Sequence, residues 1–111
     1  GYADERGEGP GEGLNLNLPL ALGTGETAYG DALRKAVGAI EDFGPDLLFV
    51  SLGTDAMATD PIGGLALTPD DFGRLGEQVA ALRRPTVVFQ EGGYDLERLG
   101  DAVAAFLAPL A

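Results

Sequence analysis

Two polar side chains follow the ends of two strand-like runs and could do chemistry together. Asp55 comes just after the strand-like run Leu47–Leu52, and Tyr94 comes just after the run Thr86–Gln90. Ligands of open α/β sheets bind in the crevice outside the carboxyl ends of the strands. A carboxylate accepts hydrogen bonds and a phenol can donate one. The two strand ends therefore define a candidate site.

Position alone leaves structural explanations open for each of these residues. Asp55 could cap a loop by accepting hydrogen bonds from backbone amides, and Tyr94 could serve packing at the start of a helix. Gly92 and Gly93 would let the backbone come close to another backbone or to a ligand. Asp60 precedes a proline, which is common in turns, so its simplest role is to hold its own loop.

The predicted strands and helices alternate along the chain. Residues 47–50 form an unbroken apolar run that Ser51 and Leu52 extend, and residues 86–89 form a second, largely apolar run. Such runs are typical of strands that are buried on both faces of a parallel sheet. Residues 14–18 alternate between leucine and asparagine, which predicts a third strand. Apolar residues recur every three or four positions in three stretches, which predicts three helices. The first spans residues 27–43, the second starts at Pro69 after an N-cap at Thr68, and the third spans roughly 96–107.

This order predicts an α/β fold with right-handed crossovers between parallel strands. Strands of the buried type need helices on both faces of the sheet, which gives a three-layer α/β/α arrangement. A three-stranded sheet is small for this class and would leave apolar edges exposed. We expect residues 1–111 to form a portion of a single domain, in which residues 1–13 are a glycine-rich loop.

Composition narrows the possible partners. The net charge of −11 disfavours nucleic acid and anionic membranes and suits a cationic small molecule. The chain has no cysteine, and no apolar run approaches a membrane span, so we expect a cytoplasmic protein. It also has no histidine and begins with Gly1 rather than methionine. These features fit either a histidine-free binding protein or a piece of a longer enzyme.

Several motifs taken together resemble the histone deacetylase superfamily, and most closely its acetylpolyamine amidohydrolase branch. The resemblance covers nearly all 111 residues in unbroken order and corresponds to the C-terminal part of the family's catalytic domain. The motifs that carry it are the glycine-rich start with Asn15 and 17–20, the run Val50–Asp55, Asp60-Pro61-Ile62, Leu67-Thr68 and Glu91–Tyr94.

The resemblance implies an arginase-like α/β fold and an enzyme with a catalytic divalent metal, normally Zn²⁺. It implies that Asp55 is a metal ligand, that Tyr94 is the catalytic tyrosine that hydrogen-bonds the substrate carbonyl, and that Gly92 and Gly93 line the substrate pocket. The metal would polarise the acetamide carbonyl and activate a water molecule. The family's other metal ligands and its histidine pair would lie upstream of Gly1, so this chain alone is predicted to be inactive.

The expected substrate is a small cationic acetylated polyamine, with an acetyl-lysine peptide as the alternative. Ser51–Asp55 followed by Asp60-Pro61-Ile62 is more similar to the polyamine deacylases than to the protein deacetylases. A homo-oligomer is possible, because a copy could cover the exposed sheet. The alternative from another class is a non-catalytic α/β module that binds a small ligand or a partner. The two interpretations differ in whether the side chains of Asp55 and Tyr94 converge on one cavity or point to opposite faces.

Overall fold

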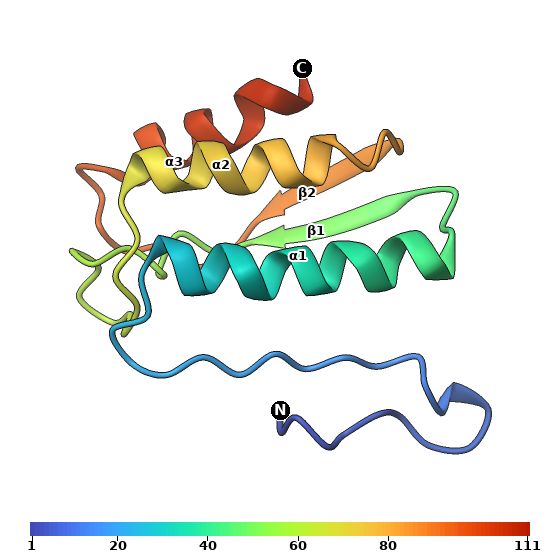
Figure 1. Cartoon of the computed structure of the whole chain (residues 1–111). Coiled ribbons are helices and arrows are strands. Elements are labelled where there is room, and N and C mark those ends of the chain that lie inside the picture. The colour runs from blue at the N-terminus through green and yellow to red at the C-terminus, as the bar shows by residue number, and fades with distance from the viewer.

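A computed structural model describes all 111 residues of the chain. Three helices are present, α1 (Glu26–Phe43), α2 (Pro69–Ala80) and α3 (Leu99–Leu107). Two strands, β1 (Leu48–Leu52) and β2 (Thr86–Gln90), form the sheet, and 3₁₀ turns lie at η1 (Gly9–Gly11) and η2 (Ala108–Leu110). The α/β order from residue 26 onward is the predicted one. Figure 1 shows α1 and α2 running alongside the two strands, with α3 next to α2.

The helix boundaries follow from local chemistry. α1 ends because Gly44 adopts a left-handed conformation, with a φ of 67°, and donates its N–H to the carbonyl of Ile40 at 3.0 Å. α2 begins after the predicted N-cap, Thr68. The Asp71 carboxylate accepts the backbone N–H of Thr68 at 2.7 Å and its hydroxyl at 2.8 Å, which satisfies groups at the helix start.

The two strands pair in parallel, with Leu48 opposite Thr86 and Leu52 opposite Gln90. The crossover between them contains α2, as a parallel pair requires. One apolar core joins the sheet to the helices. Its buried members are Leu48, Leu52, Met57, Leu67, Phe72, Leu75, Val79, Ala102 and Phe106.

The prediction that both faces of the strands are buried is wrong for this chain. Leu48 and Leu52 face the core, whereas Phe49, which points to the opposite face, is 67% exposed. The rings of Phe49 and Phe89 stack on this open face with their centroids 6.1 Å apart. All three helices pack toward the other face, where Val50 joins the core. Residues 1–111 therefore supply two of the three expected layers.

The predicted strand over residues 14–18 is also absent, and the sheet has two strands. This segment runs in an extended conformation beside α1 (Figure 1). Leu14 and Leu16 line a groove with Ala39 and Ile40 of that helix. Asn15 and Asn17 turn toward the first loop, where Asn15 Nδ2 donates to the Glu5 carbonyl at 2.9 Å. Alternation thus reflects one apolar and one polar side of an extended segment, and no strand of this chain pairs with it.

The last helix begins at Leu99, later than the predicted start near residue 96. The Asp95 carboxylate accepts the N–H groups of Glu97 and Arg98 at 3.2 and 3.3 Å, which holds residues 96–98 in a turn before the helix. None of the helices combines the length and apolar character that crossing a membrane would require.

Candidate functional site

The loops that follow β1 and β2 are joined by backbone hydrogen bonds. The N–H of Glu91 donates to the Leu52 carbonyl at 2.9 Å, at the very end of the strand ladder. Beyond it, the N–H of Thr54 donates to the Gly92 carbonyl at 2.8 Å. The parallel register carries this pairing past the strands. The sequence segments that hold Asp55 and Tyr94 therefore lie side by side at the carboxyl edge of the sheet.

Asp55 lies directly against Gly92. A Cβ atom on Gly92 would be 2.9 Å from Cγ of Asp55 and closer still to Oδ2, so only glycine leaves room for this carboxylate. The Asp55 side chain is half-buried and accepts no hydrogen bond within the chain. Its oxygen lone pairs are consequently available to a cation, a proton donor or a ligand.

Gly93 meets the same loop one residue further on. Its φ of +138° is a conformation that favours glycine, and a Cβ there would be 3.2 Å from the Cβ of Thr54 and closer to its hydroxyl. The Thr54 side chain is fully buried, and its hydroxyl has no hydrogen-bond partner. Both predicted pocket glycines therefore serve the close approach of two backbone segments.

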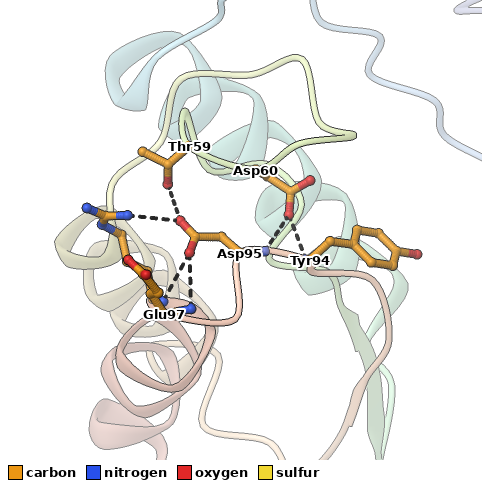
Figure 2. A network of polar contacts seen from close by, with 6 residues as sticks. Thr59, Asp60, Tyr94, Asp95 and Glu97 are labelled. Carbon is orange, nitrogen blue, oxygen red and sulfur yellow. Dashed lines mark hydrogen bonds and ion pairs between the residues drawn. The ribbon is translucent and has the colours of Figure 1, made fainter.

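Tyr94 extends outward from this junction. Its ring is 50% exposed, and Figure 2 shows the phenol pointing away from the polar network beneath its backbone. The loops that carry Asp55 and Tyr94 thus share one rim, and Gly92 lies against the Asp55 carboxylate where the loops meet. Two cavities lie along the extended N-terminal segment, and neither is lined by Asp55 or Tyr94.

A network of carboxylates fastens the two loops (Figure 2). Asp60 Oδ2 accepts the backbone N–H groups of Tyr94 at 2.7 Å and of Asp95 at 3.3 Å. The Asp95 carboxylate accepts the hydroxyl of Thr59 and lies 3.3 Å from the Arg98 guanidinium. Two neighbouring residues of the first loop therefore bind two neighbouring residues of the second. Thr59 donates to Asp95, and Asp60 accepts from Tyr94.

These bonds set the protonation of both aspartates. Burial alone would raise the pKa of Asp60, but hydrogen bonds from the backbone of Tyr94, Ile62, Gly63 and Asp95 outweigh it and lower that pKa below its ordinary value. The pKa of Asp95 is likewise lowered, chiefly by the Thr59 hydroxyl and then by Arg98, against the opposing effect of burial. Both groups are carboxylates at neutral pH.

Tyr29 of α1 is electrostatically linked to Asp55. Burial raises the pKa of the Tyr29 phenol, and the negative charge of Asp55 raises it further. Tyr29 lies four residues before Leu33, as on the apolar side of a helix, and its half-buried ring packs against the core. The spacing of apolar residues does not predict that the Tyr29 phenol lies close to the Asp55 charge.

The donor set of this chain does not complete a zinc site. A catalytic zinc normally takes three protein ligands, and no group of three or more Asp, Glu, His or Cys side chains in the structure could hold a metal ion. Asp55 can supply one carboxylate ligand. The site residues predicted from sequence therefore fit a partial metal site.

Sequence reasoning missed the role of Asp95 and Thr59 and underestimated that of Asp60. A signal for Asp95 was present, because an aspartate just before a helical pattern commonly binds the first free N–H groups of the helix. Thr59 carries no such signal. The 36-residue separation between it and Asp95 is closed only by the pairing of β1 with β2.

Comparison with known proteins places this rim in context. A family profile described as "Histone deacetylase domain" matches residues 1–110. The chain is 48% identical over 99 residues to the acetylpolyamine amidohydrolase of Burkholderia pseudomallei, covering 89% of this chain and 29% of that protein. It is 39% identical over 111 residues to the acetylpolyamine amidohydrolase of Mycoplana ramosa, covering 100% of this chain and 33% of that protein.

A solved structure agrees with these matches. The crystal structure of acetylpolyamine aminohydrolase from Burkholderia pseudomallei superimposes with a TM-score of 0.94 at 44% identity, covering 98% of this chain and 32% of that one. The resemblance and the deacetylase-like α/β fold expected from the sequence are thereby confirmed. The chain spans about a third of the length of the relatives it matches.

Proposed function

Because this chain belongs to the histone deacetylase family, we propose that it is the C-terminal portion of one catalytic domain that hydrolyses acetylated amines. The observation that carries this proposal is the shared rim. The Asp55 carboxylate lies against Gly92, two residues before Tyr94 in the sequence, at the carboxyl edge of a parallel sheet. The catalytic interpretation requires Asp55 and Tyr94 to act at one site, and the hydrogen bond between the loops that carry them supports it.

Tyr94 is the proposed hydrogen-bond donor of the reaction. Hydrolysis of an acetamide passes through a tetrahedral intermediate whose former carbonyl oxygen carries negative charge, and a donor aimed at that oxygen stabilises it. The phenol of Tyr94 is exposed and makes no hydrogen bond within the chain, so its O–H is available. Gly92 and Gly93 are proposed to line the substrate pocket, because they add no side chain of their own to the rim.

The whole enzyme is proposed to depend on Zn²⁺, with Asp55 as one ligand. The free lone pairs of Asp55 support this role, and the remaining ligands must come from residues outside this chain. Removing the metal from the full-length protein with a chelator should abolish turnover, and adding Zn²⁺ should restore it. Activity that survives complete removal of metal would contradict this part of the proposal.

The proposed substrate is an acetylated polyamine. Two matched relatives carry the name acetylpolyamine amidohydrolase, and the net charge of −11 favours a cationic ligand over an anionic one. An acetyl-lysine peptide shares the same amide chemistry but attaches it to a polypeptide. The two substrates therefore differ in what must fit around the rim, and their turnover can be compared directly.

The test is steady-state kinetics of the full-length protein with acetylputrescine and with an acetyl-lysine peptide. We expect a higher kcat/KM for acetylputrescine. A preference for the peptide would retain the deacetylase proposal and overturn the substrate. Absence of turnover with both substrates in the zinc-loaded protein, with intact folding by circular dichroism, would favour the non-catalytic binding module.

A further inference from the structure

We propose that Asp60 is a positioning residue that fixes the backbone of Tyr94 and thereby directs its phenol. This inference rests on the proposed function, because it concerns the group that would donate to the substrate oxygen. Asp60 comes from the loop after β1, and Tyr94 comes from the loop after β2, 34 residues away in sequence. Their contact therefore links the two halves of the rim.

Each carboxylate oxygen of Asp60 accepts hydrogen bonds from a different loop. Oδ1 accepts the N–H groups of Ile62 at 2.9 Å and Gly63 at 3.0 Å, which closes a turn in its own loop. Oδ2 accepts the N–H groups of Tyr94 and Asp95 at 2.7 and 3.3 Å. Asp60 is only 8% exposed, so water competes little for these bonds.

The direction of the phenol depends on this backbone contact. The Tyr94 ring is half-exposed and its hydroxyl has no partner within the chain, so side-chain contacts alone hold it weakly. Figure 2 shows the ring leaving the backbone on the side opposite the Asp95 carboxylate, directly beyond the N–H that Asp60 holds. A shift of the Tyr94 backbone would therefore move the hydroxyl with it.

A second contact between the two loops supports the bond from Asp60 to Tyr94, with donor and acceptor in the opposite order. The Thr59 hydroxyl donates to the Asp95 carboxylate. This carboxylate also accepts the backbone N–H groups of Glu97 and Arg98, just before α3. The neighbouring residues Thr59 and Asp60 are thus both hydrogen-bonded to the segment Tyr94–Asp95. Backbone hydrogen bonds hold this loop as far as Gly92. Gly93 has no side chain with which to stiffen the next step, so the bonds from Asp60 and Thr59 restrain Tyr94 and Asp95.

Asp60→Asn is the informative substitution because it preserves shape. An asparagine side chain has one acceptor oxygen and one NH₂ donor group in place of two acceptor oxygens. It can therefore satisfy either the turn at Ile62 and Gly63 or the N–H groups of Tyr94 and Asp95, while the NH₂ group faces the other set of donors. One of the two loops is released in either orientation.

The experiment is a double-mutant cycle in the full-length, zinc-loaded protein with acetylputrescine as substrate. We expect Asp60→Asn to lower kcat by about 10²-fold, the size of effect that a small misplacement of a reacting group can have, with little change in KM. In a Tyr94→Phe background the same substitution should lower kcat little further, because the hydroxyl that it would misplace is already gone. Additive losses would overturn the proposal, since a purely structural role does not depend on the Tyr94 hydroxyl.

A second readout does not require activity. With 3-fluorotyrosine incorporated at position 94, the ¹⁹F resonance of the full-length protein should shift and narrow in Asp60→Asn, as expected for a released ring. An unchanged resonance would overturn the positioning role. Failure of the unsubstituted protein to hydrolyse acetylated amines would overturn the proposed function instead, and the fluorine signal would still decide whether Asp60 positions Tyr94.

Matched variants complete the design. Asp46 is an exposed aspartate outside the network, so Asp46→Asn should leave both kcat and the fluorine resonance unchanged. If Asp60→Asn does not fold, Thr59→Val replaces it in the cycle, because it removes the reciprocal bond to Asp95 with little change in size. Thr59→Val should also lower kcat little further in the Tyr94→Phe background. Additive losses in kcat would again overturn the proposal.

Discussion

The Asp55 carboxylate occupies the space in which a side chain at position 92 would begin, since a Cβ on Gly92 would be 2.9 Å from Cγ of Asp55. This relationship joins the ends of β1 and β2 at one point of the rim. It also explains why a glycine stands between the strand end at Gln90 and the exposed Tyr94.

Gly92→Ala should therefore displace either the Asp55 carboxylate or the loop that carries Tyr94. We expect kcat/KM of the full-length protein to fall by about 10²-fold, the scale of a misplaced catalytic group. Gly38→Ala in α1 is the matched control, because a Cβ there meets nothing within 4 Å. That control should keep full activity, and an equal loss in both variants would contradict the role assigned to Gly92.

Tyr94→Phe tests the proposed hydrogen-bond donor with the smallest change, the loss of one hydroxyl. Removing a donor of this kind typically costs about 10² to 10³-fold in kcat. Because the ring is half-exposed and its hydroxyl is unpaired within the chain, the midpoint of urea unfolding should stay nearly unchanged. Wild-type turnover by Tyr94→Phe would show that another group stabilises the charged intermediate.

Local patterns predicted most of the fold. The helix over residues 26–43, the N-cap at Thr68 and the strand over 86–90 follow from periodicity and end signals that act over a few residues. The strand predicted at 14–18 was wrong because alternation reports two sides of an extended segment, whereas a strand also needs a partner. Burial of the strands on both faces was wrong because apolar runs do not say whether the covering layer lies within the same chain.

The candidate site was predictable only in part. Asp55 and Tyr94 could be placed at strand ends because β1 and β2 each signal their own end. The bonds from Asp60 to Tyr94 and from Thr59 to Asp95 join residues 34 and 36 positions apart, respectively, and depend on the exact path of both loops. No local spacing encodes such a path, so the network emerged only from the three-dimensional structure.

The lowered pKa values of Asp60 and Asp95 predict an acid limit to stability. Their unfolded forms take up protons near the ordinary aspartate pKa, about 3.9, whereas the folded forms resist protonation until lower pH. The stabilisation is therefore complete above about pH 5, decreases as protons bind the unfolded form, and is lost as the pH falls through the folded pKa values. Urea midpoints of the full-length protein between pH 7 and pH 3 should show this loss.

The double variant Asp60→Asn/Asp95→Asn should change that profile in two ways. Its urea midpoint at pH 7 should be lower than that of the unsubstituted protein. The difference should shrink below about pH 5, because protons bind the aspartates of the unfolded chain before they bind the native carboxylates. Other acidic groups titrate equally in both proteins, so the difference between the curves isolates this pair. Curves that stay parallel down to pH 3 would contradict the role of these bonds in stability.

The isolated 111-residue chain should neither bind zinc tightly nor hydrolyse acetylputrescine. Asp55 offers one carboxylate, and no cluster of three potential ligands is present, whereas a catalytic zinc normally takes three protein ligands. Calorimetric titration of the purified chain with Zn²⁺ should give no saturating high-affinity signal, and added Zn²⁺ should produce no turnover. The full-length protein, stripped of metal and reloaded, is the positive control. Zinc-dependent turnover by the purified 111-residue chain would show that these residues can assemble a metal site unaided, for example between copies.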